Sequence, residues 1–271
     1  SNILKAHCRS VQIPVTTKEI LLDIIGSIDK DSTVKEVRRG IFWTVVVSRF
    51  CGLSSTMLWE HCDQDTKEEG LLKSYTDMMA SELARLSISD NISEASLGVA
   101  AINSLIEIDD SRCIEKNAGD MLLEIGGDKN VSVIGHFPFT EDLKKVAKNL
   151  WVIEKRLRPG DYPEEDTEKY LGISDIVAIS STTLINHTLD KILKLCPENS
   201  IKILLGPTTP ITDVLFRYGI DIISGSKVID ESTALKYISE GANFRQLKRT
   251  GAIKLVTLMQ KDMLKRGGNE I

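Results

Sequence analysis

The stretch IVAISSTTLINHTLDKILKL, residues 176–195, decides the fold. Its first four residues are apolar and mostly β-branched, which predicts a short buried strand at 176–179. Four hydroxyl residues follow, and apolar residues then recur with helical spacing from Leu184 to Leu195. A buried strand that leads through a short loop into a helix is the repeating unit of a parallel α/β sheet.

The same unit recurs on both sides of this stretch. Apolar runs predict further strands at 131–134, 150–153, 201–205 and 220–223, and helical spacing predicts helices at 141–148, 212–218 and 232–240. Gly219 and Gly241 follow the last two helices, where a left-handed residue commonly ends a helix. The state of residues 252–266 stays open, because 252–259 suits a last strand or a terminal helix equally well. We therefore expect residues 109–271 to form one α/β domain with a parallel sheet.

Residues 1–108 lack this alternation and predict a smaller α+β domain. Ile20, Leu21 and Ile24 lie on one face of a helix predicted at 17–28, and Thr16 with Glu19 resembles a capping box. A β-hairpin is predicted at 33–38 and 41–48, with Gly40 at the turn, and helices are predicted at 71–83 and 93–106. The last helix carries small residues, including Gly98, that let another backbone approach closely. A length of 271 residues also favours two domains.

Composition excludes several classes of protein. The formal net charge is -5 and no long basic run is present, so a nucleic-acid partner is not expected. The apolar runs are much shorter than the roughly 18 residues needed to span a bilayer, and no signal-peptide pattern is seen, so we expect a cytoplasmic protein without a membrane partner. Five scattered cysteines without a C-x-x-C pair predict reduced, mostly buried thiols.

Polar residues follow each predicted strand of the sheet. Gly135 and His136 follow the first strand, Glu154 the second, 180–183 the third, 206–210 the fourth and 224–226 the fifth. Ligands of open α/β sheets bind outside the carboxyl ends of the strands, so these segments predict a ligand site on one rim. The segments around Ser180 and Thr208 lead into predicted helices, whose amino ends favour an anion, although Ser and Thr also serve as ordinary helix caps.

Several side chains at this rim are candidates for chemistry. His136 could bind a ligand or act as an acid–base group, and Glu154 and Asp161 could bind a hard or borderline cation or act as a base. The alternative is that they are solvated or structural residues. Of the adjacent pair Asn186 and His187, at most one faces the rim, and we favour Asn186. A weaker metal-site candidate is the trio of residues 61–63, His-Cys-Asp, which lacks a recognised spacing.

A set of short motifs in fixed order carries a family resemblance. The motifs are Gly135-His136-Phe137-Pro138, Glu154, Gly160-Asp161-Tyr162-Pro163, residues 182–188 (TTLINHT) and 206–210 (GPTTP), together with residues 50–54 (FCGLS) and 98–103 (GVAAIN) in the first part of the chain. The chain resembles the "putative heavy-metal chelation" family over nearly its whole length. The resemblance implies an enolase-N-terminal-like α+β domain, a Rossmann-like domain and a ligand site in the cleft between them. The matching residues that it implies for this site are His136, Glu154, Asp161, Thr183, Asn186, Gly206, Thr208 and Asn103. Gly135, Thr182 and Pro207 of the same motifs complete the set of candidate ligand-binding residues.

The functional hypothesis is binding of a heavy metal or a metal chelate in this cleft. His136 and Glu154 would be the metal ligands, and the identity of the metal stays open. Soft metals prefer thiolates, and no cysteine cluster lies at these motifs, so a harder cation or a metal already held by an organic chelator suits them better. The alternatives are an enzyme acting on a small anionic metabolite and a non-catalytic sensor of a small ligand. The sequence does not decide between these, or between a monomer and a homodimer.

Overall fold

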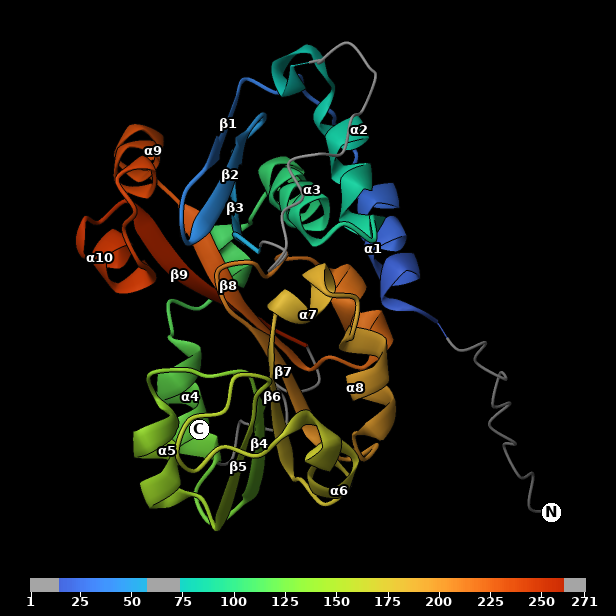
Figure 1. Cartoon of the computed structure of the whole chain (residues 1–271), viewed down its shortest axis with the longest axis vertical. Coiled ribbons are helices and arrows are strands. Elements are labelled where there is room, and N and C mark those ends of the chain that lie inside the picture. Colours follow the sequence, from blue (N-terminus) through green and yellow to red (C-terminus); the bar gives the residue numbers. More distant parts are fainter. Residues whose placement is uncertain (1–14, 58–73, 261–271) are drawn as a thin grey trace, which may run out of the picture.

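The computed structural model describes residues 15–57 and 74–260, and these form two β-sheets with helices around them (Figure 1). The smaller sheet is antiparallel and contains β1 (Glu36–Arg39), β2 (Trp43–Val47) and β3 (Cys51–Ser55) in that order. The predicted hairpin is β1 and β2, and β3 is a third strand that the sequence did not predict. The expected class, a mainly parallel α/β sheet with a smaller α+β part, is confirmed.

The larger sheet has the order β5-β4-β6-β7-β8-β9. Neighbouring strands are parallel except for β9, which is antiparallel to β8. Strand β5 pairs with one edge of β4, and β6 pairs with the other edge of β4. The order of the strands therefore reverses at β4, which places the topological switch point between β4 and β6. The bounds are β4 (Asn130–Ile134), β5 (Asn149–Ile153), β6 (Ile176–Ser180), β7 (Ile201–Leu205), β8 (Ile222–Val228) and β9 (Ile253–Met259).

The last two strands of this sheet, β8 and β9, differ from the prediction in their bounds and pairing. Residues 224–226 were expected to follow a strand, but they lie inside β8, where Ser224 pairs with Thr257 and Gly225 with Val256. The hydroxyl groups of Ser224 and Thr257 are 2.8 Å apart, so Ser224 is satisfied within the sheet, whereas the buried hydroxyl of Ser226 has no hydrogen-bond partner among the described residues. Residues 253–259 are thus a strand, and residues 261–266 lie outside the described part of the chain.

Most predicted helices are present. The capping box at Thr16 and Glu19 begins α1, and Gly219 and Gly241 have the expected positive φ. Three α-helices between residues 109 and 260, namely α4, α6 and α10, were not predicted, and the described part of the segment predicted as a helix at 71–83 contains only short helical turns. The α-helices are α1 (Thr17–Gly26), α2 (Ala80–Ala84), α3 (Ile92–Leu105), α4 (Ala118–Ile125), α5 (Thr140–Val146), α6 (Thr167–Leu171), α7 (Thr182–Ile185), α8 (Leu189–Leu195), α9 (Glu231–Ser239) and α10 (Phe244–Arg249). The 3-10 helices are η1 (Tyr75–Asp77), η2 (Arg85–Ile88), η3 (Asp110–Arg112), η4 (Glu164–Asp166) and η5 (Asp213–Tyr218).

The helix predicted at 184–195 is interrupted. It forms as α7 and α8, and the residues between them include His187, which has a left-handed φ of 55°. The Nε2 atom of His187 lies 2.7 Å from the carbonyl oxygen of Ser87, in the first part of the chain. The interruption therefore turns His187 away from the sheet rim and connects the two parts of the molecule.

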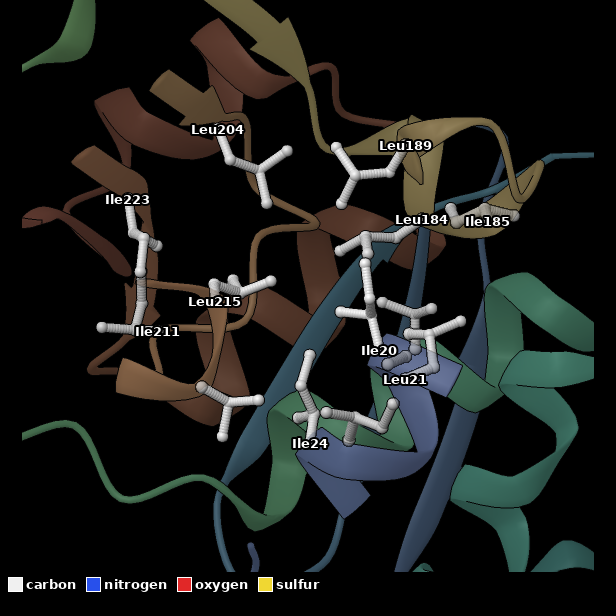
Figure 2. Packing of buried hydrophobic residues seen from close by; sticks show 14 of the residues in the cluster. Ile20, Leu21, Ile24, Leu184, Ile185, Leu189, Leu204, Ile211, Leu215 and Ile223 are labelled. Atoms are coloured by element: carbon white, nitrogen blue, oxygen red, sulfur yellow. The ribbon is translucent and has the colours of Figure 1, made fainter. Parts of the chain in front are cut away.

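The two faces of the large sheet pack against different partners. Figure 1 shows α4 and α5 on one side of the sheet and α6, α7 and α8 on the other. The first side forms a core of its own with residues such as Val131 and Ala178 of the sheet and Leu122 of α4. The second side shares its core with α1 and α3, and Figure 2 shows Ile20 and Leu21 of α1 close to side chains of α7 and α8. No helix of the described ranges is both long and apolar enough to cross a membrane.

Candidate functional site

The carboxyl ends of β4 and β7 turn sharply on the rim that contains the switch point. Gly135 follows β4 with φ 98° and Gly206 follows β7 with φ 123°. A Cβ atom on Gly206 would lie 2.9 Å from the Oγ atom of Ser181, so a side chain has neither the backbone freedom nor the space at this position. These turns bring the loops of neighbouring strands together around two cavities.

The first cavity, called here the rim cavity, has a volume of about 490 Å³ and lies at the ends of β4, β5 and β6. Its polar lining combines charged and hydroxyl side chains from the strand ends, η4 and α8. Six of the residues predicted from the sequence line it, namely Gly135, His136, Glu154, Thr182, Thr183 and Asn186. The volume lies within the usual range for small-molecule sites, about 300–1,000 Å³.

The second cavity, called here the aromatic cavity, has a volume of about 530 Å³ and shares His136, Ser180 and Thr182 with the rim cavity. The predicted residues Gly206 and Pro207 line it. Its other walls come from β2, the segment after β4, and α10, and they are rich in aromatic side chains. The two cavities are therefore neighbours, with one group of three polar residues common to both.

The contact of His136 with Arg158 favours one tautomer of the neutral imidazole. The Nδ1 atom of His136 lies 2.9 Å from Nη1 of Arg158. A guanidinium group only donates hydrogen bonds, so Nδ1 accepts, and the neutral ring carries its proton on Nε2. His136 therefore offers an N–H donor at Nε2, which suits an anionic oxygen. Coordination of a metal through Nε2 would require the other tautomer and the loss of the Arg158 contact.

The hydroxyl groups after β6 form a local network. The Oγ atom of Ser180 is 2.8 Å from Oγ1 of Thr182, and the Thr183 hydroxyl donates to the Ser180 carbonyl oxygen at 2.7 Å. Thr183 is buried and positions the turn, whereas Ser180 and Thr182 line both cavities. Ser180 was not among the selected residues, although its place at the end of a predicted strand was a signal for it.

Charges of both signs surround the rim cavity. One oxygen of Glu154 accepts a hydrogen bond from the Lys155 backbone N–H at 2.7 Å. The Nζ atom of Lys155 lies 3.7 Å from Glu164, while no side chain of the described chain forms an ion pair or hydrogen bond with Lys191 of α8. Lys191 was missed in the sequence, because a lysine on an exposed helix face normally has no function beyond solvation.

Three of the residues selected from the sequence line neither the rim cavity nor the aromatic cavity, namely Asp161, Thr208 and Asn103. Asp161 accepts a hydrogen bond from the backbone N–H of Arg158 at 2.9 Å and closes a tight turn. Thr208 is 0% exposed, and its hydroxyl accepts the backbone N–H of Ser55 at 2.9 Å. The helix predicted at 212–218 after the Thr208 segment is present as the 3-10 helix η5, which begins at Asp213 with Thr212 as its cap.

Asn103 connects the two parts of the chain. Its Nδ2 atom donates to the carbonyl oxygens of Leu53, at 2.7 Å, and Thr208, at 2.9 Å, beside a small cavity of about 140 Å³. We predict that Asn103→Ala lowers the free energy of unfolding by about 1–3 kcal/mol, because two acceptors lose their donor. Urea denaturation measures the change. The control Asn199→Ala, at an exposed loop position, is expected to stay within about 0.5 kcal/mol, and equal values for the two variants would refute the connecting role.

The described residues do not fit a bare heavy-metal ion. Within residues 15–57 and 74–260, no group of three or more His, Cys, Asp or Glu side chains could hold a metal. Burial raises the pKa of Cys51 to about 12 and that of Cys196 to about 11, which disfavours the thiolate that a soft metal needs. The trio of residues 61–63 lies outside the described part of the chain.

Fold and geometry together define an α/β protein with a cavity of small-molecule size at the switch point of its sheet. Comparison with known proteins shows that the chain belongs to the family described as "Putative heavy-metal chelation": one model of this description matches residues 117–257 and a second matches residues 22–106. An uncharacterized protein of Methanocaldococcus jannaschii is 28% identical over 253 residues, which cover 89% of this chain and 95% of the relative.

Two crystal structures of proteins of unknown function from the DUF364 family resemble this chain. The protein from Desulfitobacterium hafniense has a TM-score of 0.74 and 27% identity, and the match covers 90% of this chain and 98% of that one. The protein from Pyrococcus horikoshii has a TM-score of 0.74 and 19% identity, with 90% and 99% coverage, which supports the fold alone.

Proposed function

We propose that this protein binds a small metal-chelating organic ligand in the rim cavity and recognises the chelator together with the metal that it carries. The observation that carries the proposal is the mixed lining of this cavity, in which two carboxylates, two ammonium groups and several hydroxyl groups surround one space. Membership of the metal-chelation family agrees with a metal-containing ligand.

Anionic groups of the chelator have suitable partners in this cavity. Lys191 supplies an ammonium group with no ion-pair partner in the described chain, and the Nε2–H of His136 supplies a neutral donor. Ser180 and Thr182 also line the cavity, and because their hydroxyl groups bond to each other, one of the two is left to donate to a ligand. Hydrogen bonds between charged and neutral groups are stronger than those between neutral groups, so a carboxylate-rich chelator is a better match than a neutral molecule.

The cationic centre of such a ligand has a suitable partner in Glu154, because Glu164, the other carboxylate of the cavity, lies 3.7 Å from the Nζ atom of Lys155. One of its carboxylate oxygens is engaged by the Lys155 N–H, and the second is left for a metal. A single carboxylate does not satisfy the coordination of a metal ion, which takes four or more ligands in proteins. The remaining ligands would come from the chelator, and this requirement explains why the protein would bind the chelate and not the free ion.

Catalysis on a small anionic metabolite is a second candidate function. His136 with its proton on Nε2 and Glu154 line the same cavity, which is the arrangement of a proton donor and a base. Under this alternative, the protein converts an identified metabolite, and His136→Ala and Glu154→Ala abolish that turnover. A protein that only binds the metabolite would show no turnover in the wild type.

Calorimetric titration of the full chain with zinc citrate tests the proposed function. We expect saturable binding that Lys191→Gln weakens about tenfold, or about 1.4 kcal/mol, because the carboxylate loses its ammonium partner. The matched control is Lys129→Gln, which removes an exposed lysine before β4, at the opposite end of the sheet. Absence of binding, or equal losses in both variants, would show that the rim cavity is not the site.

A further inference from the structure

We infer that the aromatic cavity is a second binding site, which takes a planar aromatic ligand that carries a negative charge. This site goes beyond the proposed function, because its lining differs from that of the rim cavity in both polarity and charge. Its volume of about 530 Å³ is ample for a fused ring system with an acidic substituent.

The aromatic walls come from three separate segments. Phe137 and Phe139, which follow β4, stack with their ring centroids 5.2 Å apart and their planes 11° from parallel. Trp43 of β2 packs against Phe244 of α10 with centroids 5.6 Å apart. All four rings line the cavity. Aromatic side chains contribute large apolar areas and favour offset stacking or edge contacts with another ring, so these walls favour a planar aromatic group over an aliphatic one.

The charges of this cavity have one sign. Arg245 and Lys248 of α10 line it, and neither has an ion-pair or hydrogen-bond partner in the described chain. The described lining residues include neither an aspartate nor a glutamate. Two cations without a counter-charge at an apolar cavity create a positive potential, which attracts an anionic group of the ligand.

The helix that carries these cations is anchored in the fold. A capping box between Asn243 and Gln246 begins α10, and Leu247 is completely buried against the core below the small sheet. The helix that carries the two cations is therefore held beside Phe244, while the cationic side chains themselves are exposed and can turn toward a ligand. A neutral aromatic molecule would leave the two cations without partners, and an aliphatic anion would leave the aromatic walls unused.

Calorimetric titration with 2-naphthoate tests this inference. We expect one-to-one binding to the full chain, with affinity reduced about tenfold or more in the double variant Arg245→Gln, Lys248→Gln. Arg249→Gln is the matched control, because Arg249 lies on the same helix but does not line the cavity. The uncharged analogue 2-naphthylmethanol is expected to bind at least about tenfold more weakly than 2-naphthoate, because it lacks the charge.

Each outcome decides the inference. Loss of affinity in the double variant with retained affinity in the control supports it, provided that all variants keep the melting temperature of the wild type. No saturable binding of 2-naphthoate, equal binding in the double variant, or equal binding of the alcohol would overturn it. Since 2-naphthoate brings no metal, this result is independent of the zinc citrate titration, so failure of the aromatic site and failure of the proposed function are distinguishable.

Discussion

Replacing Gly98 by alanine is expected to destabilise the protein by about 3 kcal/mol or more. In an isolated helix the same change is stabilising by roughly 0.5–1 kcal/mol, because glycine loses more conformational freedom than alanine. In α3 the sign reverses: a Cβ atom on Gly98 would lie 1.9 Å from the backbone nitrogen of Ser87 and 2.6 Å from its Cα. These are backbone atoms, so relief of the overlap requires α3 and η2 to separate. The expected cost therefore lies at or above the upper end of the range that is typical of overpacking, about 1–3 kcal/mol.

Urea denaturation of Gly98→Ala against the wild type measures this effect. Gly127→Ala is the control, because a Cβ atom there meets nothing within 4 Å, and we expect it to change stability by no more than about 0.5 kcal/mol. If both variants unfold at the same urea concentration, α3 and η2 do not approach as closely as described here.

Leu21→Ala is expected to cost about 2–5 kcal/mol, because it removes a buried side chain and leaves a cavity. Leu21 is 0% exposed and belongs to the core that α1 shares with α7, α8 and η5 (Figure 2). We also expect a single unfolding transition in both the wild type and the variant, since this core joins the amino-terminal helix to the large sheet.

The neighbouring residue Leu22 provides the control for this prediction. It is 38% exposed on the same helix, and Leu22→Ala is expected to cost less than about 1 kcal/mol. Two separate transitions, only one of them shifted by Leu21→Ala, would contradict the shared core. They would instead favour independent domains at 1–108 and 109–271, a boundary that stays a prediction from the sequence.

The larger sheet could be predicted because its strands are buried on both faces and therefore appear as short apolar runs, as at 176–179 and 201–205. The strand β3, with the sequence CGLSS, lacked this signal. Glycine and serine have low strand propensity, and β3 is stabilised by its pairing with β2 and its packing beneath α3. Such contacts lie between distant segments and leave no local pattern.

The candidate site was predictable to the extent that it follows strand ends. His136 and Glu154 were found in this way, and both line the rim cavity. The cations of α10 and α8 were not found, because an exposed Arg or Lys on a helix looks the same in sequence whether or not a cavity lies beside it. Conversely, Thr208 and Asn103 look like site residues, but their hydrogen bonds join the two parts of the chain.

The most direct test of the proposal that this protein binds a metal chelate is equilibrium dialysis with elemental analysis. The full chain, carrying His61→Ala and Cys62→Ala to remove the other candidate metal ligands, is dialysed against zinc alone, citrate alone and zinc citrate. We predict that zinc is retained together with one equivalent of citrate, and that Lys191→Gln reduces the retention of both. Retention of zinc to the same extent without citrate, or no retention of zinc citrate, would contradict recognition of a chelate in the rim cavity.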